Sequence, residues 1–419
     1  MKRFLLFALC AMLSLNAEAR TIYVNASRPN NNGSGLSAKK AKKTLQAAIN
    51  VAKKGDTILV LPGTYAPIKT NNKKIAIKST KGQKKTAISV QSKTSLAALA
   101  QLGKTYSYQT SYFNDYSGKL HRCSSAPLSK GTSTTLAGFR LDGCGKPVTA
   151  FLGVSGGNVR SCTIQGIKGG DYVGVKGKLV PPGASMLASG SKLTSCTIRG
   201  NEIDCGRYGL WLFEKTSFSR CKILENAGSA YLDTGCASFG YDCRAANCLV
   251  AGNRTLTGWI GAFYSSTLVN CTVADNLSLA QKDSSGRWIG TAGPTFSNSA
   301  KWYNCILRNN MGRVDVVYEG EWVEVCGGDG DCTDGHWTEG RTQEGSPELH
   351  NVDPFNTYKN TDKTNRDPKF SSAYRLRKGS YCIDAGKLTS AQKKQVGTKD
   401  LAGRKRIRGK AIDRGCYEY

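Results

Sequence analysis

Charged side chains of complementary chemistry gather between residues 214 and 244. Removing the acidic proton beside a uronate carboxylate requires a base, often a lysine or arginine with a lowered pKa, and positive charge or Ca²⁺ to stabilise the developing enolate. The catalytic candidates are Lys215 as the base and Arg220 or Arg244 as charge stabilisers. The candidate Ca²⁺ ligands are Glu214, Asp233 and Asp242. A solvated turn without a catalytic role is the alternative interpretation of Lys215.

Large aromatic residues occur in the same part of the chain, on segments that follow a repeated phrase. The substrate-binding candidates are Trp211, Tyr231, Trp259 and Trp288. If these rings face outward, they form a platform on which pyranose rings stack. If they face inward, they belong to the core, and both interpretations stay open from the sequence.

The repeated phrase positions these residues. Each of its six copies has a polar residue, a cysteine and, two residues later, an aliphatic residue, and the cysteines are Cys162, Cys196, Cys221, Cys248, Cys271 and Cys305. Five residues after the cysteine, five of the six copies carry an asparagine, namely Asn201, Asn226, Asn253, Asn276 and Asn310. The cysteine-to-cysteine steps are 34, 25, 27, 23 and 34 residues. A repeat of this length is typical of a solenoid, because one unit cannot bury its apolar face alone.

The repeated unit is too short for two helices, and its β-branched residues followed by Gly and Asn favour a strand and a turn. We therefore predict an all-β fold, a single-stranded right-handed parallel β-helix of roughly nine to eleven coils with long loop insertions. The cysteines would lie about 4.8 Å apart inside successive coils. The asparagines would stack at the turn after the strand, where Asn tolerates a left-handed backbone. Both rows are predicted to be scaffold.

The N-terminus has the pattern of a secretion signal, with Lys2 and Arg3, an apolar run and a small-residue cleavage site near Ala19. No later stretch is apolar enough to cross a membrane. The net charge of +29 predicts contact with a polyanion, either acidic polysaccharide or anionic cell envelope, although lysines also keep strand edges apart. The chain has no specific nucleic-acid motif, and we expect a monomer.

Export permits disulfides, and nine cysteines lie outside both the signal and the repeated phrase. The predicted loop staples are Cys326 with Cys332 and Cys236 with Cys243, together with Cys382 and Cys416 across the last segment. Connectivity cannot be derived from sequence alone.

Residues 44–53 have apolar residues at helical spacing, which predicts an amphipathic helix that covers the open end of the solenoid. Together with Ile22–Asn25, Gly55–Ile58 and Pro62–Tyr65, this stretch resembles the opening of secreted β-helix proteins of the pectate-lyase-like superfamily. Asp367–Phe370, Gly379–Gly386 and Asp413–Tyr419 resemble the closing segment of bacterial choice-of-anchor β-helix proteins, although Tyr381 stands where that pattern has proline.

These features divide the chain. The predicted parts are a signal peptide (1–19), an N-terminal strand, capping helix and first coil (20–65), a β-helix (66–311) with insertions at 95–131 and 168–190, an irregular insertion (312–366) and a closing segment (367–419).

The resemblance implies action on acidic polysaccharide, with a polysaccharide lyase acting by β-elimination as the enzymatic version. In lyases of this superfamily a catalytic lysine is followed on the next coil by arginine, a place that Leu232–Gly235 occupies here. The alternatives are a non-catalytic adhesin or envelope protein that binds anionic glycan, and a structural spacer. With only three histidines and no paired aspartates of the polygalacturonase type, histidine-centred and hydrolytic chemistry are disfavoured.

Overall fold

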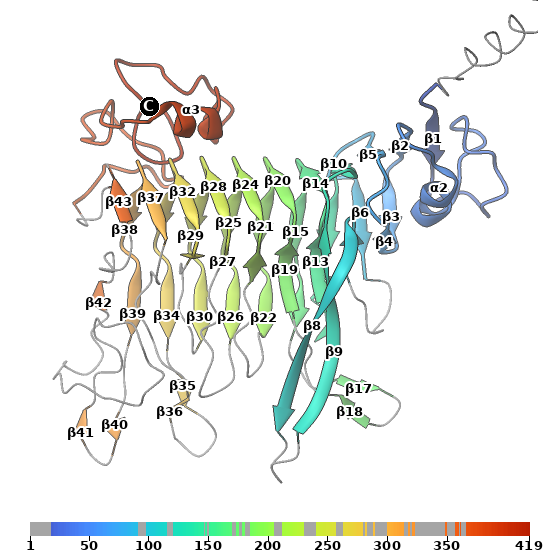
Figure 1. The fold of residues 1–419 in the computed structure, drawn as a ribbon, viewed down its shortest axis with the longest axis horizontal. Coiled ribbons are helices and arrows are strands. Elements are labelled where there is room, and N and C mark those ends of the chain that lie inside the picture. The colour runs from blue at the N-terminus through green and yellow to red at the C-terminus, as the bar shows by residue number, and fades with distance from the viewer. Residues whose placement is uncertain are drawn as a thin grey trace, which may run out of the picture.

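The computed structural model describes residues 18–90, 98–114, 120–145, 147–148, 151–169, 173–175, 178–180, 185–204, 212–229, 240–256, 263–279, 281–282, 288–289, 300–313, 317–318, 321–322, 348–349, 357–359, 361 and 366–419. Their strands form a parallel β-helix with four sheets, and each complete coil passes through sheets 1, 2, 3 and 4 in turn (Figure 1). The predicted fold is confirmed, and the right-handed rule for parallel crossovers gives its hand.

Sheets 1 and 2 are parallel throughout the described residues. Sheet 1 consists of β1 (Thr21–Val24), β2 (Thr57–Val60), β5 (Ala76–Ser79), β10 (Thr135–Ala137), β14 (Asn158–Arg160), β20 (Lys192–Thr194), β24 (Ser217–Ser219), β28 (Arg244–Ala246), β32 (Thr267–Val269), β37 (Lys301–Tyr303) and β43 (Thr357–Lys359). Sheet 2 consists of β3 (Gly63–Tyr65), β6 (Thr86–Ser89), β11 (Arg140–Asp142), β15 (Thr163–Gln165), β21 (Thr197–Arg199), β25 (Lys222–Leu224), β29 (Leu249–Ala251), β33 (Thr272–Ala274) and β38 (Ile306–Arg308).

Sheets 3 and 4 complete each coil. Sheet 3 consists of β12 (Pro147–Val148), β16 (Lys168–Gly169), β22 (Glu202–Asp204), β26 (Ala227–Ser229), β30 (Arg254–Leu256), β34 (Leu277–Leu279), β39 (Met311–Arg313) and β42 (Glu348–Leu349), of which the last pairs antiparallel. Sheet 4 consists of β4 (Ile68–Lys69), β7 (Ala100–Gln101), β13 (Phe151–Ser155), β19 (Ser185–Ser189), β23 (Phe213–Glu214), β27 (Gly240–Tyr241) and β31 (Phe263–Tyr264).

The repeated phrase forms the corner between sheets 1 and 2, which differs from the single strand predicted for it. In the first copy, β14 ends at Arg160, Ser161 adopts a left-handed backbone with φ of 49°, and β15 begins at Thr163. The same left-handed position recurs in every copy, at Ser195, Arg220, Asn247, Asn270 and Asn304. A sharp bend here lets the next residue, the cysteine, turn into the core.

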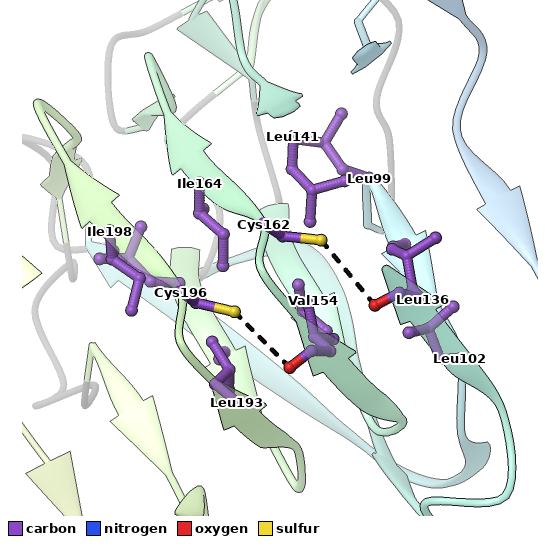
Figure 2. Close-up of a cluster of buried hydrophobic side chains, with 14 of the residues drawn as sticks. Leu99, Leu102, Leu136, Leu141, Val154, Cys162, Ile164, Leu193, Cys196 and Ile198 are labelled. Carbon is purple, nitrogen blue, oxygen red and sulfur yellow. Dashed lines mark hydrogen bonds between the residues drawn. The ribbon is translucent and has the colours of Figure 1, made fainter. Parts of the chain in front are cut away.

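The six repeated cysteines are buried in the core, as predicted, with at most 1% of their surface exposed. Four of the thiols lie near a carbonyl oxygen of the preceding coil. For example, Cys162 Sγ lies 3.8 Å from the oxygen of Leu136, and Cys196 Sγ lies 3.5 Å from that of Val159 (Figure 2). Burial raises the pKa of the Cys162 thiol well above its ordinary value, because a buried thiolate would lose its hydration. Cys162 is therefore a neutral packing group rather than a nucleophile.

The predicted asparagine ladder is confirmed at the corner between sheets 2 and 3. Asn201 Nδ2 donates to Asn226 Oδ1 at 2.8 Å, and Asn226 Nδ2 donates to Asn253 Oδ1 at 2.9 Å. The ladder continues through Asn276 to Asn310 at 2.9 and 2.8 Å. The left-handed backbone belongs to the residue before each ladder asparagine, such as Glu225 with φ of 54°. Each buried amide also donates to a strand carbonyl, which satisfies it.

The predicted capping helix is α2 (Leu45–Val51), which buries Leu45, Ala48 and Ile49 against the first coil. Thr44 caps it by accepting a hydrogen bond from the Ala47 amide. The helix lies at the β1 end of the stack in Figure 1, where it covers apolar surface that no further coil would bury.

The predicted closing segment, taken from here on with the preceding residue as 366–419, folds back over the last coils beside sheets 1 and 2 and contains α3 (Ser390–Val396) (Figure 1). Apolar contacts join Cys416 and Tyr417 to Leu249, and Val396 to Val269. Cys416 is a buried free thiol, so the predicted pairing with Cys382 is wrong.

Of the other two predicted disulfides, the structure describes one cysteine of one pair and neither cysteine of the other. Cys243 is also a buried free thiol, because it follows the corner between sheets 4 and 1 and turns inward, so the staple with Cys236 is wrong. Cys236, Cys326 and Cys332 lie outside the described residues, as does almost all of the predicted signal peptide.

Antiparallel hairpins leave the coils at several points. They are β8 (Lys104–Asn114) with β9 (Leu120–Lys130), β17 (Val173–Val175) with β18 (Lys178–Val180), β35 (Gln281–Lys282) with β36 (Trp288–Ile289), and β40 (Val317–Tyr318) with β41 (Glu321–Trp322). No helix in the described residues is both long and apolar enough to span a bilayer.

Candidate functional site

Glu214 and Lys215 form an ion pair at the corner between sheets 4 and 1. Within β23, Phe213 faces the core, so the side chain of Glu214 points to the opposite face of the sheet. Glu214 is nevertheless only 7% exposed. Lys215 follows in a left-handed conformation with φ of 45°, and its Nζ lies 3.2 Å from Glu214 Oε1.

The hairpin β8–β9 lies against sheet 4 beside this pair. Gly190, which follows β19 with φ of 58°, lets β9 approach closely, since a Cβ there would stand 2.1 Å from the carbonyl oxygen of Ser129. Tyr106 of β8 is close enough for the Glu214 charge to raise its pKa, after the larger effect of burial. Its ring also lies 5.6 Å from Lys130 Nζ. The hairpin therefore lies close enough to the pair for Tyr106 to feel the Glu214 charge.

The Glu214–Lys215 pair determines the charge of the lysine. The hydrogen bond and charge of Glu214 raise the pKa of Lys215, so its ammonium form persists beyond the ordinary range. A lysine base requires the opposite shift. Glu214 Oε2 is buried and, within the part of the chain that the structure describes, has no hydrogen-bond partner. Lys215 therefore has the electrostatics of a charge stabiliser, and its predicted role as base stays a prediction.

The remaining charged candidates are distributed around the same coils. Tyr241 pairs in register with Glu214, which puts Asp242 next to Lys215 at the same corner of the following coil. Arg244 begins β28 and is exposed, whereas Arg220 stands at the far end of β24, on the corner with sheet 2. The structure thus brings Glu214, Lys215 and Asp242 together with Arg244 nearby, and it separates Arg220 from them.

Several predictions fall on residues that the structure does not describe. Trp211, Tyr231, Trp259 and Asp233 lie outside the described residues. The backbone of Trp288 is part of β36 in a hairpin outside the four sheets, and its side chain is not described. Among the described residues, no group of three His, Cys, Asp or Glu side chains could hold a metal ion. The Ca²⁺ site that included Asp233 remains a prediction.

A row of exposed bases on sheet 1 is the feature that the sequence prediction missed. Lys192, Arg244 and Lys301 occupy one register row, separated by Ser217 and Thr267. Their strand neighbours Leu193, Ala245 and Trp302 are buried, so the three bases point outward. Two strand spacings separate each base from the next, or roughly 9.6 Å. We call this set the basic row.

The whole outer face of sheet 1 shares this sign of charge. The strands of sheet 1 that the structure describes contain no acidic residue, and their bases are Lys78, Arg160, Lys192, Arg244, Lys301 and Lys359. Sheets 2, 3 and 4 differ, since they contain Asp142, Glu202 and Glu214. The three bases of the basic row form no ion pair with any described residue. Their charges are therefore available to an external anion.

The repeated phrase could have located the basic row. Lys192, Arg244 and Lys301 each stand four residues before a repeated cysteine. Because the cysteine sets the register of every coil, that position always falls on the same outward row of sheet 1.

Comparison with known proteins yields fold likeness alone. No protein-family model matches the chain, and no curated protein sequence matches it. Among solved structures it is similar to the pectate lyase Pel9A, at 13% identity and a TM-score of 0.43 over 96% of each chain. It is also similar to a rhamnogalacturonan lyase, at 12% identity and a TM-score of 0.36 over 90% of this chain and 98% of that one.

A third similar structure is the pectin methylesterase PemA from Erwinia chrysanthemi, at 14% identity and a TM-score of 0.31 over 68% of this chain and 90% of that one. Identities and TM-scores this low leave the chemistry of this chain to be argued from its own residues.

Proposed function

We propose that this is a secreted or cell-surface β-helix protein that binds acidic polysaccharide along sheet 1. The observation that carries the proposal is the basic row, in which three exposed bases recur on every second coil of a face without acids. An extended polyuronate presents carboxylates at regular intervals along its length. A flat sheet with regularly spaced cations matches such a polymer better than it matches a compact ligand.

The residues between the bases support a sugar rather than a bare polyanion. Ser217 and Thr267 alternate with the cations on the same row, so hydroxyl groups stand next to each charge. A hydroxyl both donates and accepts hydrogen bonds, as sugar hydroxyls do. Each exposed ion pair contributes only about 0.2–1 kcal/mol, so binding depends on several contacts made together.

The charges of Lys215 and Glu214 favour a protein that binds the polysaccharide without cleaving it. Lys215 lies two residues before Ser217, which stands between Lys192 and Arg244 in the row, but it remains protonated beside Glu214. In the second candidate function, β-elimination, its ammonium group would stabilise the enolate rather than remove the proton. That version requires a base other than Lys215.

Titration with pectate, alginate and glycosaminoglycan fragments tests the proposal. The triple variant Lys192→Ala/Arg244→Ala/Lys301→Ala should bind about 10–100-fold more weakly, and wild-type affinity should fall with salt. The matched control Lys81→Ala/Lys84→Ala/Lys85→Ala removes three exposed lysines elsewhere and should bind like wild type. Equal losses of affinity in the two triple variants would show that the basic row contributes only non-specific charge attraction.

Absorbance of unsaturated products, followed with and without Ca²⁺, separates the two functions. Product that disappears in Lys215→Ala would support β-elimination. Binding without product supports the adhesin, and neither binding nor product would leave a structural spacer.

A further inference from the structure

The closing segment buries its acids and exposes its bases. Asp400, Asp413 and Glu418 are at most 2% exposed, and Asp367 is the one acid of the segment that is exposed. The exposed bases of the segment are Arg366, Lys369, Arg377, Lys378, Lys387, Lys393, Lys394, Lys399, Lys405, Arg408 and Lys410. This surface is thus more positive than the composition of the segment implies.

One loop of the segment, residues 405–410, is held in a defined shape by a buried arginine. Arg406 is 2% exposed, and its Nη2 donates to the carbonyl oxygen of Gly415 at 2.6 Å. Its Nε lies 3.4 Å from Glu418 Oε1. On the other side, Asp384 Oδ1 accepts a hydrogen bond from the Ala411 amide at 2.9 Å. The loop is therefore preorganised, and the residues around Arg406 are directed to solvent.

The outer surface of this loop combines positive charge with exposed apolar groups. Ile407 is 44% exposed and stands between Lys405 and Arg408, which are also exposed. Arg408 Nη1 donates to the carbonyl oxygen of Tyr419, whose side chain is 48% exposed. An isoleucine and a tyrosine are thereby held at the same surface as three bases, the third being Lys410.

We propose that loop 405–410, together with Tyr419, docks on an anionic lipid surface. The bases supply attraction to anionic headgroups, about fivefold in affinity for each basic residue. Ile407 and Tyr419 would enter the interfacial layer, where apolar and aromatic side chains gain by leaving water. A highly charged polysaccharide or nucleic acid gives Ile407 no such gain, which is why the exposed isoleucine favours a lipid partner. The surface is separate from the basic row and does not depend on it.

Vesicle co-sedimentation tests this proposal with the full chain. Vesicles of phosphatidylcholine mixed with phosphatidylglycerol should bind the protein, and vesicles of phosphatidylcholine alone should not. Lys405→Ala/Arg408→Ala/Lys410→Ala should weaken binding about a hundredfold. Ile407→Ser should weaken it up to about tenfold while leaving the salt dependence unchanged. All four residues are exposed, so melting temperatures should stay near wild type.

The control is again the Lys81→Ala/Lys84→Ala/Lys85→Ala triple, which removes the same charge from a turn without exposed large apolar residues. It should bind the mixed vesicles like wild type. The proposal fails if the two triples lose affinity equally, if Ile407→Ser binds like wild type, or if the loop variants weaken polyuronate binding instead of vesicle binding. Polyuronate binding by the basic row is measured separately, so each proposal can fail alone.

Discussion

The corner between sheets 1 and 2 carries different residue types in the early and the late copies of the repeated phrase. The left-handed residue before the cysteine is Ser161, Ser195 and Arg220 in the first three copies, and Asn247, Asn270 and Asn304 in the last three. The buried interior is alike in both groups, with a cysteine below the bend. The difference therefore concerns what lies outside the coil.

The late asparagines bind the closing segment. Asn247 Nδ2 donates to the carbonyl oxygens of Val396 and Lys399 at 2.8 and 3.1 Å. Asn270 Nδ2 donates to those of Asp413 and Gly415 at 2.9 and 3.3 Å. One left-handed position thus serves two purposes: any residue that tolerates the bend suffices in the early coils, and an amide donor is needed where a second layer of chain packs.

The largest effect is expected where early and late coils share a buried asparagine. Asn253→Ala removes the amide that donates to Asn276 Oδ1 and to the Ile223 carbonyl oxygen. It also leaves the backbone and side-chain donors of Asn226 without their acceptor. Unsatisfied buried groups cost about 1–3 kcal/mol each, so we expect a loss of about 3–5 kcal/mol in the free energy of unfolding, measured by denaturant titration.

The matched control for Asn253→Ala is Asn158→Ala. Asn158 is half-buried at the start of β14, and its loss should cost less than about 0.5 kcal/mol. A ladder variant no less stable than this control would contradict the structural role of the ladder.

The stability of the closing segment on the late coils should depend on pH, and that of the early coils should not. Burial raises the pKa of Glu418 to about 7, from an ordinary value of 4.5. Between these values the folded state binds the Glu418 proton more tightly than the unfolded chain does. Its contribution to stability is therefore complete below pH 4.5 and is lost as the pH rises through 7, by about 3 kcal/mol in total.

Hydrogen exchange in the closing segment at several pH values measures this effect. Amides such as that of Cys416, which donates to Thr272 Oγ1 at 3.1 Å, should be less protected at pH 8 than at pH 5, after correction for intrinsic exchange. Glu418→Gln should remove the difference, and protection in β14 and β20 should not follow it. A segment equally protected at both pH values would exclude Glu418 as the titrating group.

Converting a late corner to the early type should release the closing segment. Asn270→Ser loses both Nδ2 hydrogen bonds to the segment, because a serine hydroxyl is too short to reach them, and we expect a cost of about 2 kcal/mol. The measurement is the rate of proteolysis within residues 366–419. The reverse change, Ser195→Asn, should leave that rate unchanged, since the closing segment bonds to the late corners.

The smallest expected loss of stability comes from removing a repeated cysteine, and it should be equal in the early and the late coils. Cys221→Ala and Cys271→Ala each remove one sulfur atom from a fully buried site, and each should cost about 1 kcal/mol. Thermal unfolding of the two variants checks this. Clearly unequal losses would show that the interior also differs between early and late coils.

Most of the scaffold could be predicted because it repeats. The cysteine and asparagine rows, the β-helix and the helix over residues 45–51 follow from spacing, since stacked coils put equivalent positions in contact. The bend at Ser161 was missed because a five-residue alternation looks alike in one strand and in two short strands joined by a left-handed residue. The Cys382–Cys416 pairing failed because a pair of cysteines in sequence says nothing about their separation in space.

The candidate site was harder to predict than the scaffold. Glu214 and Lys215 were identified from their types. The raised pKa of Lys215 depends on the buried Glu214 carboxylate, and its burial follows from the tertiary packing rather than from the local sequence. The basic row was missed because its members are 52 and 57 residues apart along the chain, as the numbers of Lys192, Arg244 and Lys301 give. Only the strand register brings them onto one face.

The sequence by itself determined that this chain stacks coils, because every copy of the repeated phrase has the same local preference to bend and to bury a cysteine. The tertiary structure alone decided which charges meet. Lys215 pairs with Glu214 under a hairpin, Lys192 aligns with Arg244 across two coils, and Asn270 meets the closing segment 143 residues away. Those contacts depend on insertion lengths and on layers packed over the coils, and no local preference encodes either.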